Sequence, residues 1–396
     1  MKAGFVRVWI KKNQREITET IENFKFEDSV DEDNMVELRI KEEFAFALTD
    51  DPDIFPQQLI QFQWGFKGSS TSPIHVARIS DIETTYGERV KLTIRALDKG
   101  VEAKKVYREK IWENMTSSQI AVSIAKSLNM TPIVEDTTKV WKEYPQINKS
   151  DFQLLSELAS KEGAGRMMFY ISGETLYFVK KDLSIKAKWL FKYGEASFIS
   201  FAPKLRESTQ KPASNAAQTV QVNSKTNAVT KIEAEPDPVN LGDNLLNFDV
   251  DGNLLDKPPV LSTFQMPIDD DDTDEAKNQV TTQKRKAGEK VLGGSLKVEG
   301  LPDYKAGQLC SIANVAQRHL GNWYIDKVTH TLGGDSPYLC TLDLHKNGTS
   351  KAAKPNAGKA DKTNKTEGQK DAKTKKTVYE WDVNGNPKDG NPFKNR

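Results

Sequence analysis

Two cysteines and four histidines are the side chains of this sequence best suited to nucleophilic or metal chemistry. The histidines are His75, His319, His330 and His345. None stands in a His-Glu-x-x-His pattern or beside a second candidate zinc ligand, and His330 alternates with strand residues, which favours a structural role. Cys310 and Cys340 lack metal-site spacing and lie in apolar, strand-like segments, so we expect two small core residues rather than a nucleophile.

Other catalytic and ligand-binding patterns are also missing. The sequence has no Gly-x-Ser-x-Gly elbow, and no glycine-rich turn precedes a predicted helix as a phosphate loop would. The acidic run at 269–275 suggests calcium, but its spacing is not that of an EF-hand loop, and we interpret it as the anionic first turn of a helix with Ala276 and Val280. We therefore predict no catalytic residue, no cofactor, no metal site and no enzymatic activity.

The side chains to which we assign a binding role lie near the C-terminus. Residues 351–376 hold nine lysines against three acidic residues, a net charge of +6, and no large apolar side chain. Such a segment is predicted to be an extended tether. Val378, Tyr379 and Trp381 follow it, and we predict that they bind a neighbouring subunit or another protein of the same assembly by adding a strand to a sheet edge. The alternative is a frayed terminus.

The elements before residue 100 are predicted to be antiparallel strands. Apolar residues alternate with polar ones at Val36, Leu38 and Ile40, at Ile60, Phe62, Trp64 and Phe66, and at Val90, Leu92, Ile94 and Ala96. Period two with one apolar face predicts strands that cover a core on one side. We expect a small barrel or sandwich, with the aromatic row as core rather than as a ligand pocket.

A short α/β module follows, with two marked helices. Thr116 with Gln119, and Ser150 with Gln153, form capping boxes at the starts of these helices. We expect the first helix to end near Asn129 and the second at Gly163. Strands are predicted at 167–171 and 176–179, joined by a turn at 172–174.

The predicted fold class is α+β, mainly β, with two small antiparallel barrel-like domains flanking the module. Polar composition from 203 to 288 predicts a linking region with a hairpin that pairs 219–222 with 230–234, and strands return between 291 and 344. The predicted domains are 1–98, 99–185, 186–288, 289–347 and 348–396, the last being the tether and docking peptide.

Composition excludes several functional classes. The 57 Lys and Arg residues balance 56 Asp and Glu residues, which removes the usual argument for a nucleic-acid-binding protein. No run of eighteen apolar residues exists, so no transmembrane segment is predicted, and the first residues do not form a secretory signal.

The order and spacing of several segments resemble the phage late-control protein D family, the central tail hub of contractile phages. The strongest segments are 110–165, with Met115 to Ile120 and Gln146 to Phe152, and 290–345. The C-terminal part includes Gly321-x-Trp323-Tyr324 and Val328-x-His330. Related hub modules occur in the valine-glycine-repeat spike proteins of type VI secretion.

This resemblance implies a structural baseplate hub. The expected assembly is a homotrimeric ring whose six barrel-like domains adapt the six-fold tail tube to a three-fold spike, in the virion tail or in a phage-like injection particle. Implied partners are other copies of the chain, the tail spike protein, the tail tube protein, other baseplate proteins and the tape-measure protein. Two alternatives stay open at this point: a tail-associated cell-wall hydrolase, and a receptor- or glycan-binding tail protein.

Overall fold

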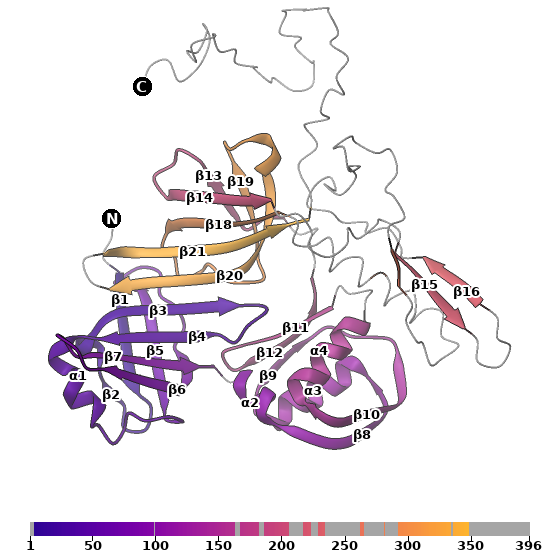
Figure 1. The fold of residues 1–396 in the computed structure, drawn as a ribbon, viewed down its shortest axis with the longest axis horizontal. Coiled ribbons are helices and arrows are strands. Elements are labelled where there is room, and N and C mark those ends of the chain that lie inside the picture. Colours follow the sequence, from indigo (N-terminus) through magenta and orange to yellow (C-terminus); the bar gives the residue numbers. More distant parts are fainter. Residues whose placement is uncertain are drawn as a thin grey trace, which may run out of the picture. The chain divides into compact units, whose positions relative to one another are not determined.

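The computed structural model describes residues 4–98, 100–162, 167–181, 186–205, 217–222, 229–233, 262–264, 281, 292–333 and 336–347. The first part of the chain contributes seven strands to one large sheet (Figure 1). They are β1 (Gly4–Ile10), β2 (Arg15–Glu16), β3 (Ile21–Ser29), β4 (Met35–Ile40), β5 (Leu59–Phe66), β6 (His75–Thr85) and β7 (Lys91–Leu97). Their order is β3-β4-β7-β6-β5-β1-β2, and all pairs are antiparallel. The short helices η1 (Thr18–Thr20) and α1 (Glu42–Thr49) connect these strands.

The last part of the chain extends the same sheet. Its elements are β13 (Trp189–Lys192), β14 (Phe198–Leu205), β18 (Leu292–Glu299), β19 (Leu309–Ala313), η3 (Gln317–His319), β20 (Gly321–Gly333) and β21 (Ser336–Lys346). The order β14-β18-β21-β20 continues into β3, because β20 pairs with β3 from Lys327 opposite Ser29 to Gly333 opposite Asn23. β3 and β20 lie side by side in Figure 1. Segments three hundred residues apart therefore share one thirteen-stranded sheet.

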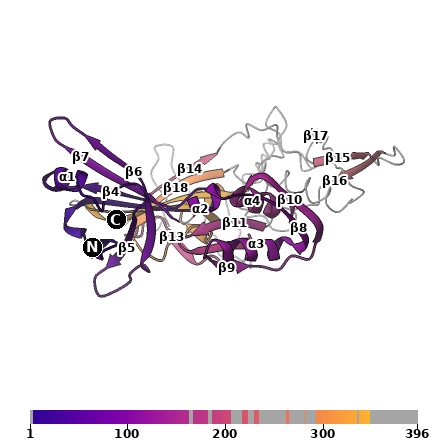
Figure 2. The same ribbon diagram turned by 90° about the horizontal axis from the view of Figure 1, so that it is seen from below.

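The α/β module, residues 100–180, forms its own layers. It consists of α2 (Gly100–Lys105), β8 (Tyr107–Thr116), α3 (Ser117–Ser127), β9 (Thr131–Val134), β10 (Val140–Ser150), α4 (Asp151–Lys161), β11 (Met167–Ser172) and β12 (Thr175–Lys180). β8 and β10 make a two-stranded ribbon, and β11, β12 and β9 make a small sheet in which β12 and β9 are parallel. α3 and α4 contact both and lie between them in Figure 1, and Figure 2 shows the same helices and strands from below.

Both predicted capping boxes are confirmed. The Thr116 hydroxyl accepts from the Gln119 backbone N–H at 3.3 Å, and the Gln119 side chain accepts from the Thr116 N–H at 2.9 Å. Ser150 and Gln153 repeat the arrangement at 3.2 and 2.9 Å. The first helix ends as predicted, with Asn129 in the left-handed region at φ 53°. Gly163 lies outside the described residues.

The polar hairpin of the linking region is also confirmed. β15 (Ala217–Val222) pairs antiparallel with β16 (Val229–Glu233), with Thr219 opposite Ile232. On its other side, β15 pairs in parallel with β17 (Ser262–Phe264). The acidic run at 269–275 lies outside the described residues, as does the helix expected there. The domain boundaries stay a prediction, whereas the mainly β, antiparallel character is confirmed.

Two apolar clusters hold these layers together. The larger one joins both parts of the big sheet and includes the aromatic row Phe62, Trp64 and Phe66, whose side chains are buried as expected. The second belongs to the α/β module, with Ile120 and Ile124 of α3 against Leu155 and Leu158 of α4. Burial of such apolar faces supplies most of the stability of secondary structure this short.

Candidate functional site

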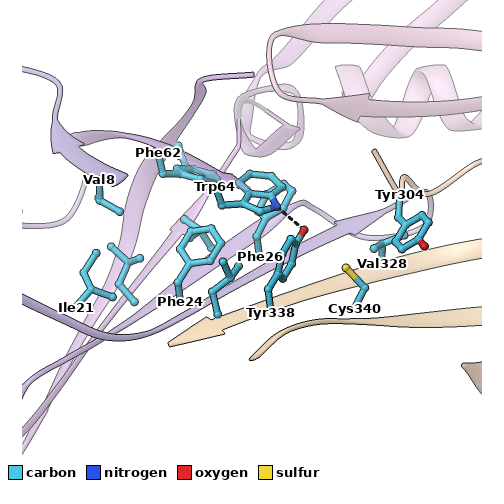
Figure 3. Close-up of a cluster of buried hydrophobic side chains, with 14 of the residues drawn as sticks. Val8, Ile21, Phe24, Phe26, Phe62, Trp64, Tyr304, Val328, Tyr338 and Cys340 are labelled. Atoms are coloured by element: carbon cyan, nitrogen blue, oxygen red, sulfur yellow. Dashed lines mark hydrogen bonds between the residues drawn. The ribbon is translucent and has the colours of Figure 1, made fainter. Parts of the chain in front are cut away.

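One cysteine and one histidine of the C-terminal strands lie close enough to resemble a catalytic pair. The Cys340 Sγ atom is 3.1 Å from His330 Nδ1, and the Tyr338 hydroxyl is 2.7 Å from the same nitrogen. Trp64 donates its indole N–H to the Tyr338 oxygen at 3.0 Å, an interaction that connects the two parts of the sheet (Figure 3). The direction of the Tyr338–His330 hydrogen bond follows the tautomer of the imidazole.

The electrostatics of this pair are opposite to those of a reactive thiol. Both side chains are at most 1% exposed. Burial raises the pKa of the Cys340 thiol to about 12 and lowers the pKa of His330 to about 3, so both groups are neutral at physiological pH. A nucleophilic cysteine needs a thiolate and access for its substrate. Cys310 is buried too, and its pKa is raised for the same reason. Both cysteines are core residues, as expected.

His75 belongs to the same aromatic cluster as His330, because their ring centroids lie 4.9 and 5.0 Å from that of Trp64. His75 stacks on Phe62 with ring centroids 5.4 Å apart, and burial lowers its pKa to about 4. His345 is paired through Nδ1 with the Asp326 carboxylate at 2.7 Å. Within the described ranges, no group of three or more His, Cys, Asp or Glu side chains is placed to hold a metal ion.

A pair of buried carboxyls lies where the large sheet meets the α/β module. Asp98 accepts backbone N–H bonds from Gly100 at 2.9 Å and from Gly173 at 3.2 Å, and Asp28 accepts from Ala306 at 2.9 Å. Burial raises the pKa of Asp98 to about 8, and it raises the pKa of Asp28 as well. The N–H donors favour the ionised carboxylates, but the loss of solvent outweighs them. The sequence patterns do not predict this junction.

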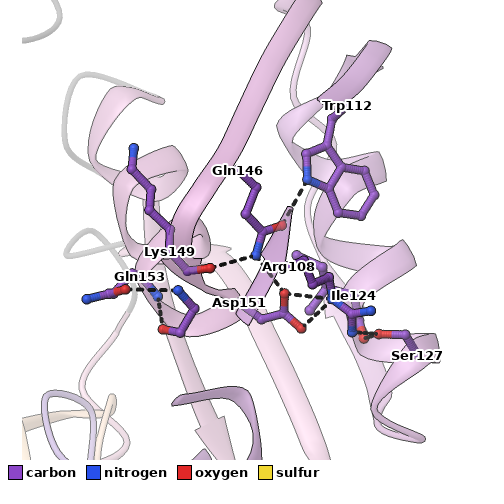
Figure 4. A network of polar contacts seen from close by, with 9 residues as sticks. Arg108, Trp112, Ile124, Ser127, Gln146, Lys149, Asp151 and Gln153 are labelled. Carbon is purple, nitrogen blue, oxygen red and sulfur yellow. Dashed lines mark hydrogen bonds and ion pairs between the residues drawn. The ribbon is translucent and has the colours of Figure 1, made fainter. Parts of the chain in front are cut away.

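The α/β module has a second buried carboxylate with a different environment. Asp151, at the start of α4, is fully buried and accepts from the Arg108 guanidinium at 2.9 Å (Figure 4). Gln146 donates to the same carboxylate at 2.9 Å and accepts from Trp112 at 3.1 Å. A compensated ion pair of this kind fixes the ribbon against the helix. Arg108, Trp112, Gln146 and Asp151 all bond to other side chains of the module, which points to structure rather than catalysis.

The outer surface offers interaction sites instead. Besides Phe55, Ile74 and Ile133, the exposed large apolar side chains of the described residues fall into three groups. They are Phe46 and Tyr86 on α1 and the β6–β7 turn; Tyr107, Ile111, Val140 and Ile147 on the β8–β10 ribbon; and Leu190, Tyr193 and Ile199 on β13 and β14. Val378, Tyr379 and Trp381, the predicted docking residues, lie outside the described residues. None of the described helices has the length and apolar character needed to cross a membrane.

Solved structures with this fold are proteins of phage tails and of type VI secretion. A 43 kDa tail protein of prophage MuSo2 from Shewanella oneidensis is 12% identical, with a TM-score of 0.64 over 87% of this chain and 99% of that one. A tail protein from Neisseria meningitidis is 10% identical, with a TM-score of 0.60 over 87% and 97%. An E. coli type VI secretion component, described as structurally similar to the T4 tail proteins gp27 and gp5, is 8% identical, with a TM-score of 0.50 over 82% and 73%.

The sequence matches a family model but no curated protein. Among curated proteins, no sequence matches the chain. A family model described as the Alg8 N-terminal domain matches residues 16–333. The match covers most of this chain, which therefore belongs to the Alg8 N-terminal domain family.

Proposed function

We propose that this protein is the central hub of a contractile-tail baseplate, of the late-control protein D type. The observation that carries the proposal is the likeness to a prophage tail protein along almost the whole of that protein, so that the shared fold is the entire tail component and not one domain of it. The low identity limits this likeness to the fold, and the function is our inference from it. The location that goes with it is the tail baseplate of a virion or of a related injection particle.

The hub is a homotrimer in this proposal. Residues 1–98 and 289–347 act as two barrel-like domains, held together by the β3–β20 pairing. Three subunits then present six similar β units to a six-fold tail tube, while the trimer itself matches a three-fold spike. A ring of this kind requires heterologous contacts that close on themselves.

The activity is binding and not catalysis. The described Cys340–His330 pair has a neutral thiol with no access to solvent, and the partners proposed here are proteins. They are other copies of the chain, the tail spike, the tail tube, other baseplate proteins and the tape-measure protein. Residues 99–185 and 186–288 are the module and the linking region between the two barrel-like domains. The tail at 348–396 acts as a lysine-rich tether, and Val378, Tyr379 and Trp381 bind a neighbouring subunit or another baseplate protein.

Electron microscopy of the purified chain tests the proposal. We expect negative-stain class averages with three-fold rings and a central channel, and a mass by light scattering of three times the 44.5 kDa chain. A chain that stays monomeric at high concentration, both alone and with the spike protein, contradicts the hub. Cleavage of peptidoglycan or binding of glycans by a monomer would support the two alternatives instead.

A further inference from the structure

Two exposed faces of opposite charge lie far apart in the strand order of the large sheet. The acidic face consists of Glu42, Glu43, Phe46 and Asp50 of the α1 segment with Tyr86 of the β6–β7 turn. The basic face consists of Lys188, Leu190, Lys192 and Tyr193 of the β13 segment with Ile199 of β14. Helix α1 contacts β7, and five strands separate β7 from β14 in the sheet.

The acidic face is built by the outward side of a helix. Ala45 and Leu48 turn towards the sheet and are buried, which leaves Glu43, Phe46 and Asp50, spaced by three or four residues, on the opposite side. Phe46 is 61% exposed and its ring centroid is 6.0 Å from that of Tyr86. Residues 41–53 contain five acidic side chains and one lysine. Three of these carboxylates are paired within the chain, Glu42 with Arg89, Asp51 with Arg15 and Asp53 with Lys12. Glu43 and Asp50 are the carboxylates that the face presents beside the apolar centre.

The basic face has the same design with the opposite sign. Phe191 of β13 is buried, so Leu190 and the lysines at 188 and 192 alternate onto the outer side of the strand. Tyr193 is 64% exposed and packs edge-on against Phe198, with ring centroids 5.7 Å apart. Residues 186–193 contain three lysines, of which Lys192 is paired with Glu195 at 3.1 Å. Exposed apolar side chains at the centre and charges at the rim are the composition of protein interfaces.

We propose that the acidic face of one subunit binds the basic face of the next copy of this chain. The occupant is a second copy because each face supplies the charge that the other lacks, together with an apolar centre that the other can pack against, and complementary charge sets the register of such contacts. Since the two faces are different surfaces, the contact is heterologous, and repetition of it generates a ring. This inference rests on the proposed trimer and adds the identity of the surfaces that form it.

Charge reversal on the full-length chain tests the contact. The first variant is Glu42→Lys/Glu43→Lys, the second is Lys188→Glu/Lys192→Glu, and the third combines all four changes. Matched controls are Glu109→Lys/Glu113→Lys and Lys126→Glu/Lys142→Glu, because these exposed residues lie on the α/β module and change the net charge equally. Sedimentation velocity measures the assembly of each chain at low and at high salt, and circular dichroism confirms that each is folded.

The single-face variants are expected to associate at least about tenfold more weakly than the wild type at low salt, because like charges then meet at every contact. The combined variant restores the trimer, since its faces are again complementary, and the controls assemble like the wild type. Salt weakens the wild-type trimer. A trimeric wild type whose assembly the single-face variants leave unchanged, or a combined variant no better than either, overturns the assignment of the faces alone. A wild type that never forms trimers overturns the hub itself.

Discussion

Asp28 and Asp98 each continue a row of buried strand residues into the junction with the α/β module. Asp28 follows Phe24 and Phe26 at a spacing of two, and Asp98 follows Ile94 and Ala96 in the same way. A carboxyl at the end of an apolar row was therefore visible in the sequence. Its burial was not, because it depends on contacts with the turn at 172–173 and with the segment at 306.

Replacement of Asp98 by Asn tests the raised pKa. An unfolded Asp titrates near about 3.9, whereas Asp98 in the folded chain titrates at about 8. Between these values the folded state holds a proton that the unfolded state has lost, so stability declines as pH rises from about 4 to about 8. Urea denaturation at pH 5 to 9 should show Asp98→Asn gaining stability relative to the wild type as pH increases.

The exposed Asp136 provides the control for this series. Asp136→Asn should follow the wild-type curve at every pH, because an exposed carboxyl has the same surroundings in both states. A constant difference between Asp98→Asn and the wild type across the range would mean that Asp98 is ionised throughout.

The Tyr338 hydroxyl is a second residue-scale test, because it satisfies two buried partners, Trp64 and His330. Tyr338→Phe leaves the buried Trp64 indole N–H without its acceptor, and the free energy of unfolding should fall by about 1–3 kcal/mol. Tyr86→Phe, which removes a hydroxyl from a residue that is 66% exposed, should change it little. Equal effects of the two substitutions would indicate that the Trp64–Tyr338 bond contributes nothing to the seam.

At the scale of elements, local sequence signals located the helices that have strong caps. Helices α3 and α4 begin at the two capping boxes, and their apolar stripes form the core of the module. Helix α1 was not predicted, since Lys41 at its N-cap position makes no side-chain cap. Its eight residues are held by the burial of Ala45 and Leu48 against the sheet.

Removal of the caps measures their contribution. Ser150→Ala and Thr116→Ala should each lower the stability of the chain by about 0.5–2 kcal/mol, because the N–H of the third helical residue loses its acceptor. Thr116→Ser keeps the hydroxyl and should retain most of the wild-type stability. Chemical denaturation provides the measurement. An unchanged stability of Ser150→Ala together with lost assembly would assign Ser150 to an interface instead.

At the scale of the whole molecule, the tail after Asn347 should act in assembly and not in folding. Truncation after Asn347 removes none of the described core, so the shortened chain is expected to fold and to form trimers. It should be incorporated less efficiently into particles, as measured by quantitative blotting of purified particles. A full-length chain with Val378→Ser, Tyr379→Ala and Trp381→Ala should show the same defect if the apolar peptide is responsible. Normal incorporation of both chains would exclude the docking role.

Elements with local signals could be predicted from the sequence. Period-two rows predicted β4, β5 and β7, capping boxes predicted α3 and α4, and a glycine with φ 59° at position 173 makes the turn between β11 and β12. It also predicted the burial of Cys310 and Cys340, because both lie within apolar strands. These features depend on neighbours within a few residues, which a reader of the sequence can inspect directly.

The pairing of strands that are distant in the sequence depends on the folded chain as a whole. The sequence suggested two separate β units, but β3 and β20 join them in one sheet, and Phe26 lies opposite His330. The alternation of apolar residues in a strand predicts which of its faces is buried, but not which other strand it pairs with. Many strands with the same alternation could pair equally well. The Asp98 junction and the two charged faces could not be predicted from the sequence for the same reason. Each consists of residues that are distant in the sequence and that come together only in the folded sheet.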